Sequence, residues 1–317
     1  MKLKFGIYWG AACGGCDVAI LDTHEKILEI ADMADIFLWP LAMDFKYKEI
    51  RALEDNYLDA SFFSGAIRNS ENEEIARLLR RKSKVMVALG ACAHIGGIPG
   101  LANMYTREDV LNRVYRESES TINEEGIIPR EAWSEGEYEL ELPRFYNTVK
   151  TLDQIINVEY YIPGCPPVPL QIYSALTLVR DGMLPPKGSV IGAGDRALCE
   201  QCPRVKEEKK LTGLKRVHEV IPDPEKCLLE QGLICLGPVT RSGCGSRCIK
   251  SGVPCRGCYG PVDDVKDQGF AMLSALASSL DAKEQKDIDA IIDTIEDPLR
   301  TLHRFSLAAS MLRRKKV

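Results

Sequence analysis

Short apolar runs alternate with longer amphipathic stretches through the first half of the chain. Residues 2–9 form an apolar run of strand length, and a glycine-rich turn separates it from residues 17–34, where apolar side chains recur with helical spacing. Because strands that alternate with helices form right-handed crossovers and a parallel sheet, we expect residues 1–180 to form a doubly wound α/β domain. Further strand-length apolar runs occupy residues 36–39, 57–63, 85–89 and 158–162, and a polar helical stretch occupies residues 72–81.

The alternation is interrupted within the first half and lost after it. A polar insert at about residues 98–141 is expected to form surface loops with short helices. From about residue 181 the apolar runs are few until residues 272–280 and 288–295, which return to helical spacing. A region so poor in apolar runs needs a bound metal to stabilise it. We therefore expect residues 181–317 to form a second, loop-rich domain with terminal helices.

Composition and charge exclude several classes of protein. The 317 residues are 45% hydrophobic and 27% charged, which is typical of a globular protein rather than a disordered one. The formal net charge of −5 gives no basic face for nucleic acid. No apolar run approaches the ~18 residues of a membrane helix, and the N-terminus has no cleavage-site pattern, so we expect a cytoplasmic protein without a membrane partner.

The cysteines point to a function that the overall composition and charge do not indicate. In a reducing cytoplasm twelve cysteines are not expected to form disulfides, so metal binding becomes the leading interpretation. Twelve is three times four, and a cubane iron–sulfur cluster takes four thiolates, although zinc sites satisfy the same arithmetic. The cysteines are Cys13, Cys16, Cys92, Cys165, Cys199, Cys202, Cys227, Cys235, Cys244, Cys248, Cys255 and Cys258.

Four of the cysteines are far apart in sequence and follow predicted strands. We call Cys13, Cys16, Cys92 and Cys165 the first set. The carboxyl ends of parallel strands meet at one edge of a sheet, so these thiols are expected to converge there, with neighbouring glycines allowing the backbone to approach a cofactor closely. The competing interpretation is that Cys92 and Cys165 are small buried apolar residues.

The other eight cysteines are dense and fall into two groups by spacing. Cys199-x2-Cys202 with Cys227 and Cys235 forms the second set, and Cys244-x3-Cys248 with Cys255-x2-Cys258 forms the third set. Paired short spacings in a loop-rich region are a strong metal signal, but they do not distinguish iron–sulfur clusters from zinc. Pro166 and Pro203 directly after cysteines resemble the Cys-Pro end of bacterial ferredoxin motifs, which favours iron and sulfide.

Three motifs together resemble the small, electron-transferring subunit of [NiFe] hydrogenases. They are Cys13-Gly-Gly-Cys16, the segment from Gly90 through Cys92 to Pro99, and Gly164-Cys165-Pro-Pro167. The resemblance covers most of the chain and implies a flavodoxin-like N-terminal domain and three [4Fe–4S] clusters. By position, it assigns the first set to the proximal cluster, the second set to the distal cluster and the third set to the medial cluster.

Two positions differ from the pattern common in other members of the family, and they narrow the resemblance to one subgroup. Periplasmic and membrane-bound members commonly have histidine at the position of Cys199 and often proline at the position of Cys248, whereas here both are cysteine. The chain therefore looks most like the gamma subunit of cytoplasmic F420-non-reducing, or methyl-viologen-reducing, hydrogenases of methanogens and their relatives. That resemblance implies a large subunit that holds the nickel, a [2Fe–2S] delta subunit, and electron flow toward heterodisulfide reductase.

The histidines and one aspartate are further candidates for functional roles. His94 is close to Cys92, but every cluster is already supplied with cysteine, and His24, His218 and His303 are expected on the surface or on helix faces. Asp17 is the carboxylate best placed for a proton path toward a large subunit, and helix capping is the simpler expectation.

The sequence supports one function and leaves two alternatives. The leading hypothesis is an electron conduit from H2 oxidation in a large subunit to an acceptor protein. A complex-I-type, quinone-linked small subunit shares the proximal domain, but it usually has adjacent cysteines in place of Cys13-x2-Cys16 and lacks the eight later ones. A zinc-stabilised scaffold without redox chemistry is the third hypothesis.

Overall fold

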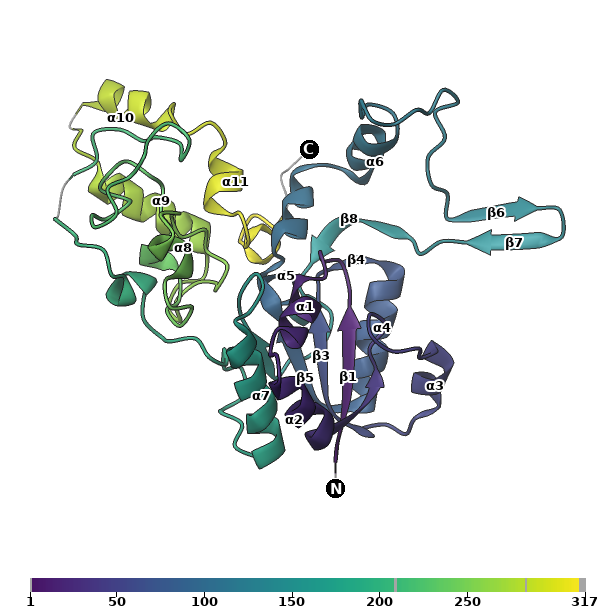
Figure 1. Cartoon of the computed structure of the whole chain (residues 1–317). Coiled ribbons are helices and arrows are strands. Elements are labelled where there is room, and N and C mark those ends of the chain that lie inside the picture. The colour runs from purple at the N-terminus through teal and green to yellow at the C-terminus, as the bar shows by residue number, and fades with distance from the viewer. Residues whose placement is uncertain (1, 208–209, 283, 314–317) are drawn as a thin grey trace.

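A five-stranded, fully parallel sheet forms the centre of the N-terminal lobe in this computed structural model, which describes residues 2–207, 210–282 and 284–313 (Figure 1). Neighbouring strands all pair in parallel, in the order of a flavodoxin-like doubly wound sheet. The α/β fold class expected from the sequence is confirmed. In spatial order the strands are β2 (Ala34–Leu38), β1 (Leu3–Trp9), β3 (Leu58–Ser64), β5 (Ser83–Leu89) and β9 (Tyr160–Ile162).

Helices cover both faces of this sheet and enclose two apolar layers. Phe62 and Phe63 are neighbours in β3, yet they belong to different layers because successive side chains of a strand point to opposite faces. This two-sided burial explains the near-continuous apolar strands. One layer is covered by α1 (Gly15–Leu21), α2 (Lys26–Met33) and α7 (Pro169–Asp181), and the other by α3 (Tyr47–Ala52), α4 (Ser70–Lys82) and α5 (Gly90–Ile95).

The prediction of a single helix at residues 17–34 is wrong. The structure has two helices there, α1 and α2, because the chain turns between them and His24 adopts a left-handed conformation with φ of 55°. A left-handed residue cannot continue a right-handed helix.

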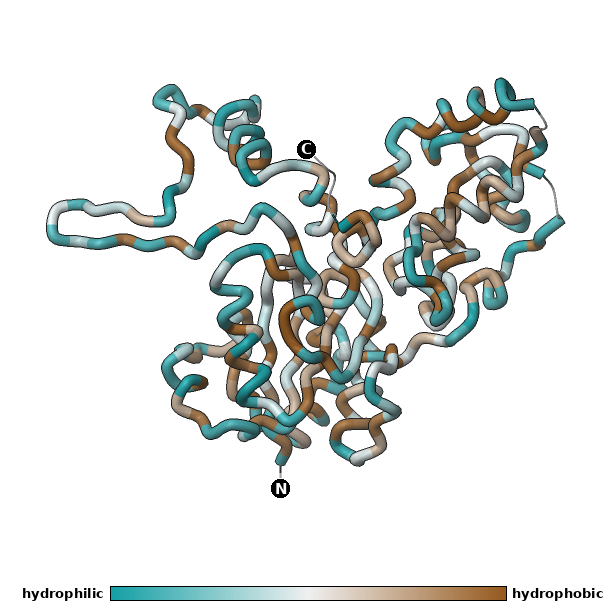
Figure 2. The backbone as a smooth tube through the Cα atoms, turned by 180° about the vertical axis from the view of Figure 1, so that it is seen from behind, coloured by the Kyte–Doolittle hydropathy of each residue, from teal (hydrophilic) through white to brown (hydrophobic). Residues whose placement is uncertain are grey.

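The insert contains an element that the sequence did not predict. Loops and the short helices η1 (Ile98–Met104) and α6 (Arg107–Tyr115) are present there as expected, and a further short helix, η2 (Leu152–Gln154), follows the insert. Strands β6 (Ala132–Glu135) and β7 (Tyr138–Glu141) form an antiparallel hairpin that projects from the molecule, with apolar positions along β7 (Figure 2). The chain returns through β8 (Phe145–Lys150), which pairs with β4 (Ile67–Asn69).

The C-terminal lobe has an apolar core of its own, although the sequence there has few apolar runs. Leucines that are far apart in sequence, such as Leu198, Leu228 and Leu236, belong to one apolar cluster with Met272 and Leu276. Asp297 caps the helix that begins at Pro298. The helices are η3 (Leu198–Gln201), η4 (Gly237–Val239), α8 (Arg247–Lys250), α9 (Gln268–Ser279), α10 (Gln285–Ile292), α11 (Pro298–Leu302) and η5 (Leu307–Ala309).

The two lobes meet through buried contacts. The hydroxyl of Tyr259 donates a hydrogen bond of 2.7 Å to the side chain of Gln171 in α7. Near the end of the chain, η5 packs against the N-terminal lobe, where Gln154 donates to the carbonyl of Ala308. Among the described residues, no helix has the length and apolar character needed to cross a membrane.

Candidate cofactor sites at the three cysteine sets

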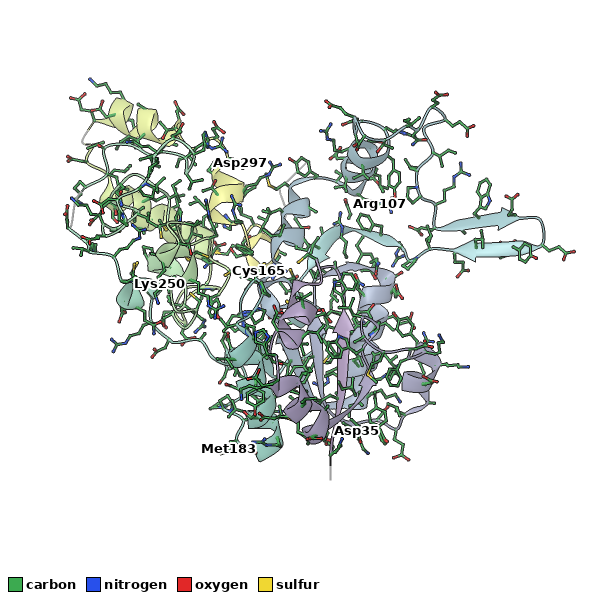
Figure 3. All side chains as sticks on the ribbon, in the orientation of Figure 1. Asp35, Arg107, Cys165, Met183, Lys250 and Asp297 are labelled. Atoms are coloured by element: carbon green, nitrogen blue, oxygen red, sulfur yellow. The ribbon has the colours of Figure 1, made fainter. Side chains whose placement is uncertain are left out.

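The first set gathers at the carboxyl edge of the sheet, as its position after three strands predicted. Cys13 and Cys16 follow β1, Cys92 lies in α5 after β5, and Cys165 follows β9. The amide of Ala91 donates to the carbonyl of Gly164 at 2.8 Å, which joins two of these segments. Cys16 and Cys92 are buried, whereas Cys13 and Cys165 are exposed, and Cys165 lies where the two lobes meet (Figure 3).

Two glycines hold the backbone directly against thiols of the first set. A Cβ atom at Gly90 would lie 2.4 Å from Cys16 Sγ, and one at Gly97 would lie 2.5 Å from Cys92 Sγ. Both glycines also have positive φ angles, of 82° and 58°. Any larger residue would therefore displace a thiol as well as strain the backbone.

Burial and mutual repulsion keep the thiols of Cys16, Cys92 and Cys165 protonated in the absence of a cation. Burial raises the pKa of Cys16, and the sulfurs of Cys92 and Cys165 raise it further. Burial also raises the pKa of Cys92 to about 12, with Cys165 and Cys13 adding to the effect. Four thiolates could share this edge only if a positively charged group such as metal ions were bound among them.

The second set, in the C-terminal lobe, also combines a buried thiol of raised pKa with a glycine beside the sulfurs. Burial, together with the sulfurs of Cys235, Cys227 and Cys202, raises the pKa of Cys199 to about 12, so these three sulfurs lie within electrostatic reach of Cys199. A Cβ atom at Gly237 would lie 3.1 Å from Cys199 Sγ and 3.6 Å from Cys235 Sγ. Gly237 therefore leaves the space that lies beside both sulfurs open.

The third set lines a cavity of about 410 Å³ at the boundary between the lobes. Cys244, Cys248, Cys255 and Cys258 all contribute to its wall, as does Cys165 of the first set. Burial, together with the nearby sulfurs of Cys165, Cys248 and Cys244, raises the pKa of Cys258 to about 12. The cavity thus gathers four thiols around a volume that could hold a cofactor.

Two backbone amides connect the third set to the other two. The amide of Cys165, in the first set, hydrogen-bonds to the sulfur of Cys258. The amide of Cys255 donates to the sulfur of Cys235, in the second set, at 3.3 Å. Along the molecule, the third set therefore contacts both neighbours.

The cysteines do not form compact single-ion sites. Within residues 2–207, 210–282 and 284–313, no three Cys, His, Asp or Glu side chains converge closely enough to hold one metal ion. The thiols of the third set are near one another electrostatically and line a cavity of about 410 Å³, which is a larger space than one ion needs.

Asp17 does not cap its helix, contrary to the simpler expectation. The cap position of α1 belongs to Gly14, which has a left-handed conformation. The Asp17 carboxylate is completely buried and accepts hydrogen bonds from Trp39 Nε1 at 2.9 Å and from the Ser64 hydroxyl at 3.1 Å. It therefore anchors α1, which carries Cys16, to the ends of β2 and β3.

Two histidines have more enclosed positions than the sequence suggested. His24 and His218 are exposed, as expected, but His303 is buried and pairs with Asp267 at 3.0 Å. His94 stacks on Tyr161, and burial together with Arg241 lowers the pKa of His94 to about 3. His94 is therefore neutral at physiological pH.

Arg256 is a charged residue near the sites that the sequence did not single out. Burial lowers the pKa of Arg256, and the neighbouring guanidinium of Arg304 lowers it further, while nearby cysteine sulfurs act in the opposite direction. Its place between Cys255 and Cys258 was visible in the sequence, but its surroundings depend on the fold. The sulfurs concerned are those of Cys235, Cys255 and Cys248.

Comparisons with known proteins place the chain in a family. The family described as NADH ubiquinone oxidoreductase, 20 Kd subunit, matches residues 13–179. The chain is 41% identical to the iron–sulfur subunit of the F420-non-reducing hydrogenase of Archaeoglobus profundus over 99% of both chains. It is 39% identical to the corresponding F420-non-reducing hydrogenase subunit of Methanothermobacter marburgensis over 98% of this chain and 96% of that protein.

A solved structure agrees with the fold over most of the chain. The [NiFeSe] hydrogenase of Desulfovibrio vulgaris Hildenborough matches with a TM-score of 0.55 at 16% identity, covering 82% of this chain and 94% of that one. The family match alone covers only the part shared with complex-I-type subunits, whereas the full-length relatives extend through the C-terminal cysteines. The chain therefore belongs to the family described as NADH ubiquinone oxidoreductase, 20 Kd subunit, alongside the iron–sulfur subunits of F420-non-reducing hydrogenases, and is a hydrogenase subunit, that is, a subunit of an oxidoreductase.

Proposed function

We propose that this chain conducts electrons through three [4Fe–4S] clusters, held in the order first set, third set, second set. The observation that carries the proposal is the pair of amide contacts from Cys165 to Cys258 and from Cys255 to Cys235. They make the third set the common neighbour of the other two. The first set would hold the proximal cluster, the third set the medial cluster and the second set the distal cluster.

The residues present fit such cofactors. Each set offers four cysteines, and the third set surrounds a cavity of about 410 Å³. Gly90 and Gly97 leave no room for side chains beside Cys16 and Cys92, so bare backbone faces the sulfurs. What the cofactors supply when bound is one-electron storage at each set of thiolates.

The chain's own residues shield the cysteine sulfurs from water and donate hydrogen bonds to them. Cys16, Cys235 and Cys255 are buried within the apolar clusters of the two lobes, and Cys92 is also buried, so these four cysteines are shielded from water. Amides that donate to sulfur, such as that of Cys255, stabilise negative charge there and tune reduction potential. Electron transfer would thus run inside the protein and meet solvent only at the exposed cysteines.

The proposal includes partners that this chain requires. With all twelve cysteines assigned to clusters, the nickel ligands must belong to a large subunit, and the exposed Cys13 at the strand-end edge is the part of the first set that would face it. By its resemblance, the chain would pass electrons to a [2Fe–2S] delta subunit and on toward heterodisulfide reductase. Twelve free thiols also favour a reducing compartment, the cytoplasm.

Metal analysis of the native complex tests the cofactor assignment. The complex, purified without oxygen, should contain about twelve iron and twelve sulfide per copy of this chain, beyond those of its partners, and should be brown. Stoichiometric zinc with little iron in this chain would contradict the proposal. A second measurement separates the subunits: the purified chain alone should not exchange H2 with water protons, because it would hold no nickel.

A further inference from the structure

A basic groove lies beside the second and third sets, on the outer side of Arg256. Its volume is about 580 Å³, and it has more cationic than acidic side chains in its wall. The acidic residues are Glu296 and Asp297. The lysine and arginine residues are Lys215, Arg216, Arg256, Arg300 and Arg304.

Two of these arginines lack the partners that the others have. Arg216 pairs with Glu296, and Arg300 pairs with Asp297 at 3.2 Å. Within the part of the chain that the structure describes, Arg256 and Arg304 have no hydrogen-bond or ion-pair partner, and Arg304 Nε is buried without one. Two half-buried guanidinium groups that repel each other require a compensating negative charge nearby.

The proposed clusters would supply that negative charge on the inner side of Arg256. The same residue lines both the basic groove and the cavity of the third set, so it stands in the wall between them. Its electrostatic neighbours include the sulfurs of Cys255 and Cys248 in the third set and Cys235 in the second set. No carboxylate among the groove residues is left to pair with it, because Glu296 and Asp297 already have partners.

We propose that Arg256, supported by Arg304, raises the reduction potentials of the cofactors held by the third and second sets. The inference rests on the proposed function. A fixed positive charge stabilises the reduced form of an anionic cluster, because reduction adds a negative charge. Since Arg256 is half-buried, water and salt screen this interaction less than they screen exposed charges. Arg256 therefore determines how easily an electron reaches the middle and exit of the path.

Redox titration of the complete complex, followed by the iron–sulfur signals in electron paramagnetic resonance, tests the inference. In Arg256→Gln the midpoint potential of the third-set cluster should become more negative. The ratio of reduced to oxidised cluster at a fixed solution potential should fall roughly tenfold, the size expected for one charge at an effective dielectric constant of about 20. Arg256→Lys keeps the charge and should restore most of the original potential.

Arg216→Gln is the matched control. It removes one positive charge from the same groove, but Arg216 is exposed and already paired with Glu296, so the potentials should stay unchanged. An unchanged potential in Arg256→Gln, or an equal shift in Arg216→Gln, would overturn the inference. If Arg256→Gln fails to retain its clusters, the same titration is carried out on Arg304→Gln. A more negative midpoint potential of the third-set cluster in that variant supports the inference, and an unchanged potential overturns it.

The wild-type titration keeps the two proposals distinguishable. Failure to find three sets of iron–sulfur signals in the unmodified complex would contradict the proposed function. The difference between wild type and Arg256→Gln, measured when those signals are present, concerns the inference alone.

Discussion

The indole N–H of Trp39 donates a hydrogen bond of 2.9 Å to the carboxylate of Asp17, which is completely buried. This contact joins the end of β2 to the helix that carries Cys16. A buried carboxylate needs such donors, because each one replaces a lost contact with water.

Replacing Trp39 with phenylalanine should therefore destabilise the protein. The change keeps an aromatic ring but removes one of two donors to a buried charge, at a cost of about 2 kcal/mol in the free energy of unfolding. Chemical denaturation measures this cost. Trp133→Phe is the control, since Trp133 donates to Glu135 at 3.0 Å in an exposed hairpin and its loss should be close to neutral. Equal effects of the two changes would contradict a special role for the Asp17 contact.

Adding a methyl group at Gly90 should empty the first set. In Gly90→Ala the new Cβ atom would overlap Cys16 Sγ, so the thiol must move and iron content should fall by about four atoms per chain. Gly188→Ala is the matched control: Gly188 has a similar φ of 92° but nothing within 4 Å of the added atom. It should cost about 1–2 kcal/mol in stability and leave the iron content unchanged. Iron loss in both variants would point to backbone strain instead.

Cys248→Pro should convert the cluster of the third set to a three-iron form. Proline supplies no thiolate, and Cys248 is the second residue of the short helix α8, where a backbone amide has no partner within the helix. The remaining cluster should still pass electrons at a shifted potential, so H2-dependent reduction of the acceptor should slow. Exchange between H2 and protons at nickel needs no electron to leave, so it should be nearly unchanged. Loss of both activities would place Cys248 near the active site.

Asp267 should contribute a constant stabilisation over the pH range in which the protein is handled. Burial by itself raises the pKa of Asp267, but hydrogen bonds from the amides of Phe270 and Met311 and the interaction with His303 together hold this pKa below its ordinary value. A carboxyl with a lowered folded pKa stabilises the protein at every pH above its unfolded pKa of about 3.9 and loses the effect only below it.

Asp267→Asn should accordingly lower the free energy of unfolding by about 2 kcal/mol, equally at pH 5 and pH 8. Denaturation curves of wild type and variant at both values measure the difference. A cost that changes between pH 5 and pH 8 would mean that the protonation of His303, and not the Asp267 carboxylate alone, governs the pair.

The sequence predicted those features that depend on local pattern and on strand order. The five strands follow from apolar runs, and the convergence of Cys13, Cys92 and Cys165 follows because the ends of parallel strands share one edge. The burial of His303 was not predictable, since it depends on Asp267, which lies 36 residues away. The β6–β7 hairpin has little contact with either core, so its sequence lacks the pattern of buried positions by which a strand is predicted.

The contacts between the sets were likewise invisible in the sequence. Spacing suggested which cysteines form the second and third sets, but not that Cys255 would approach Cys235 or that Cys165 would approach Cys258. Such contacts arise where separate loops pack together, and a hydrogen bond to sulfur leaves no periodic pattern. Arg256 was overlooked for the same reason.

The wide separation of the first set has a consequence for how the protein matures. Cys13 and Cys165 lie at opposite ends of the N-terminal lobe's sequence, and their meeting requires that β1, β5 and β9 are already paired in one sheet. The third set, in contrast, lies wholly within residues 244–258. Because a chain is synthesised from its N-terminus, the first set cannot form until β9 has emerged and paired, whereas the cysteines of the third set emerge later but need no distant strand to bring them together. A chain halted before β9 would therefore lack the site at the sheet edge altogether, while a chain halted after β9 could form it without the C-terminal lobe.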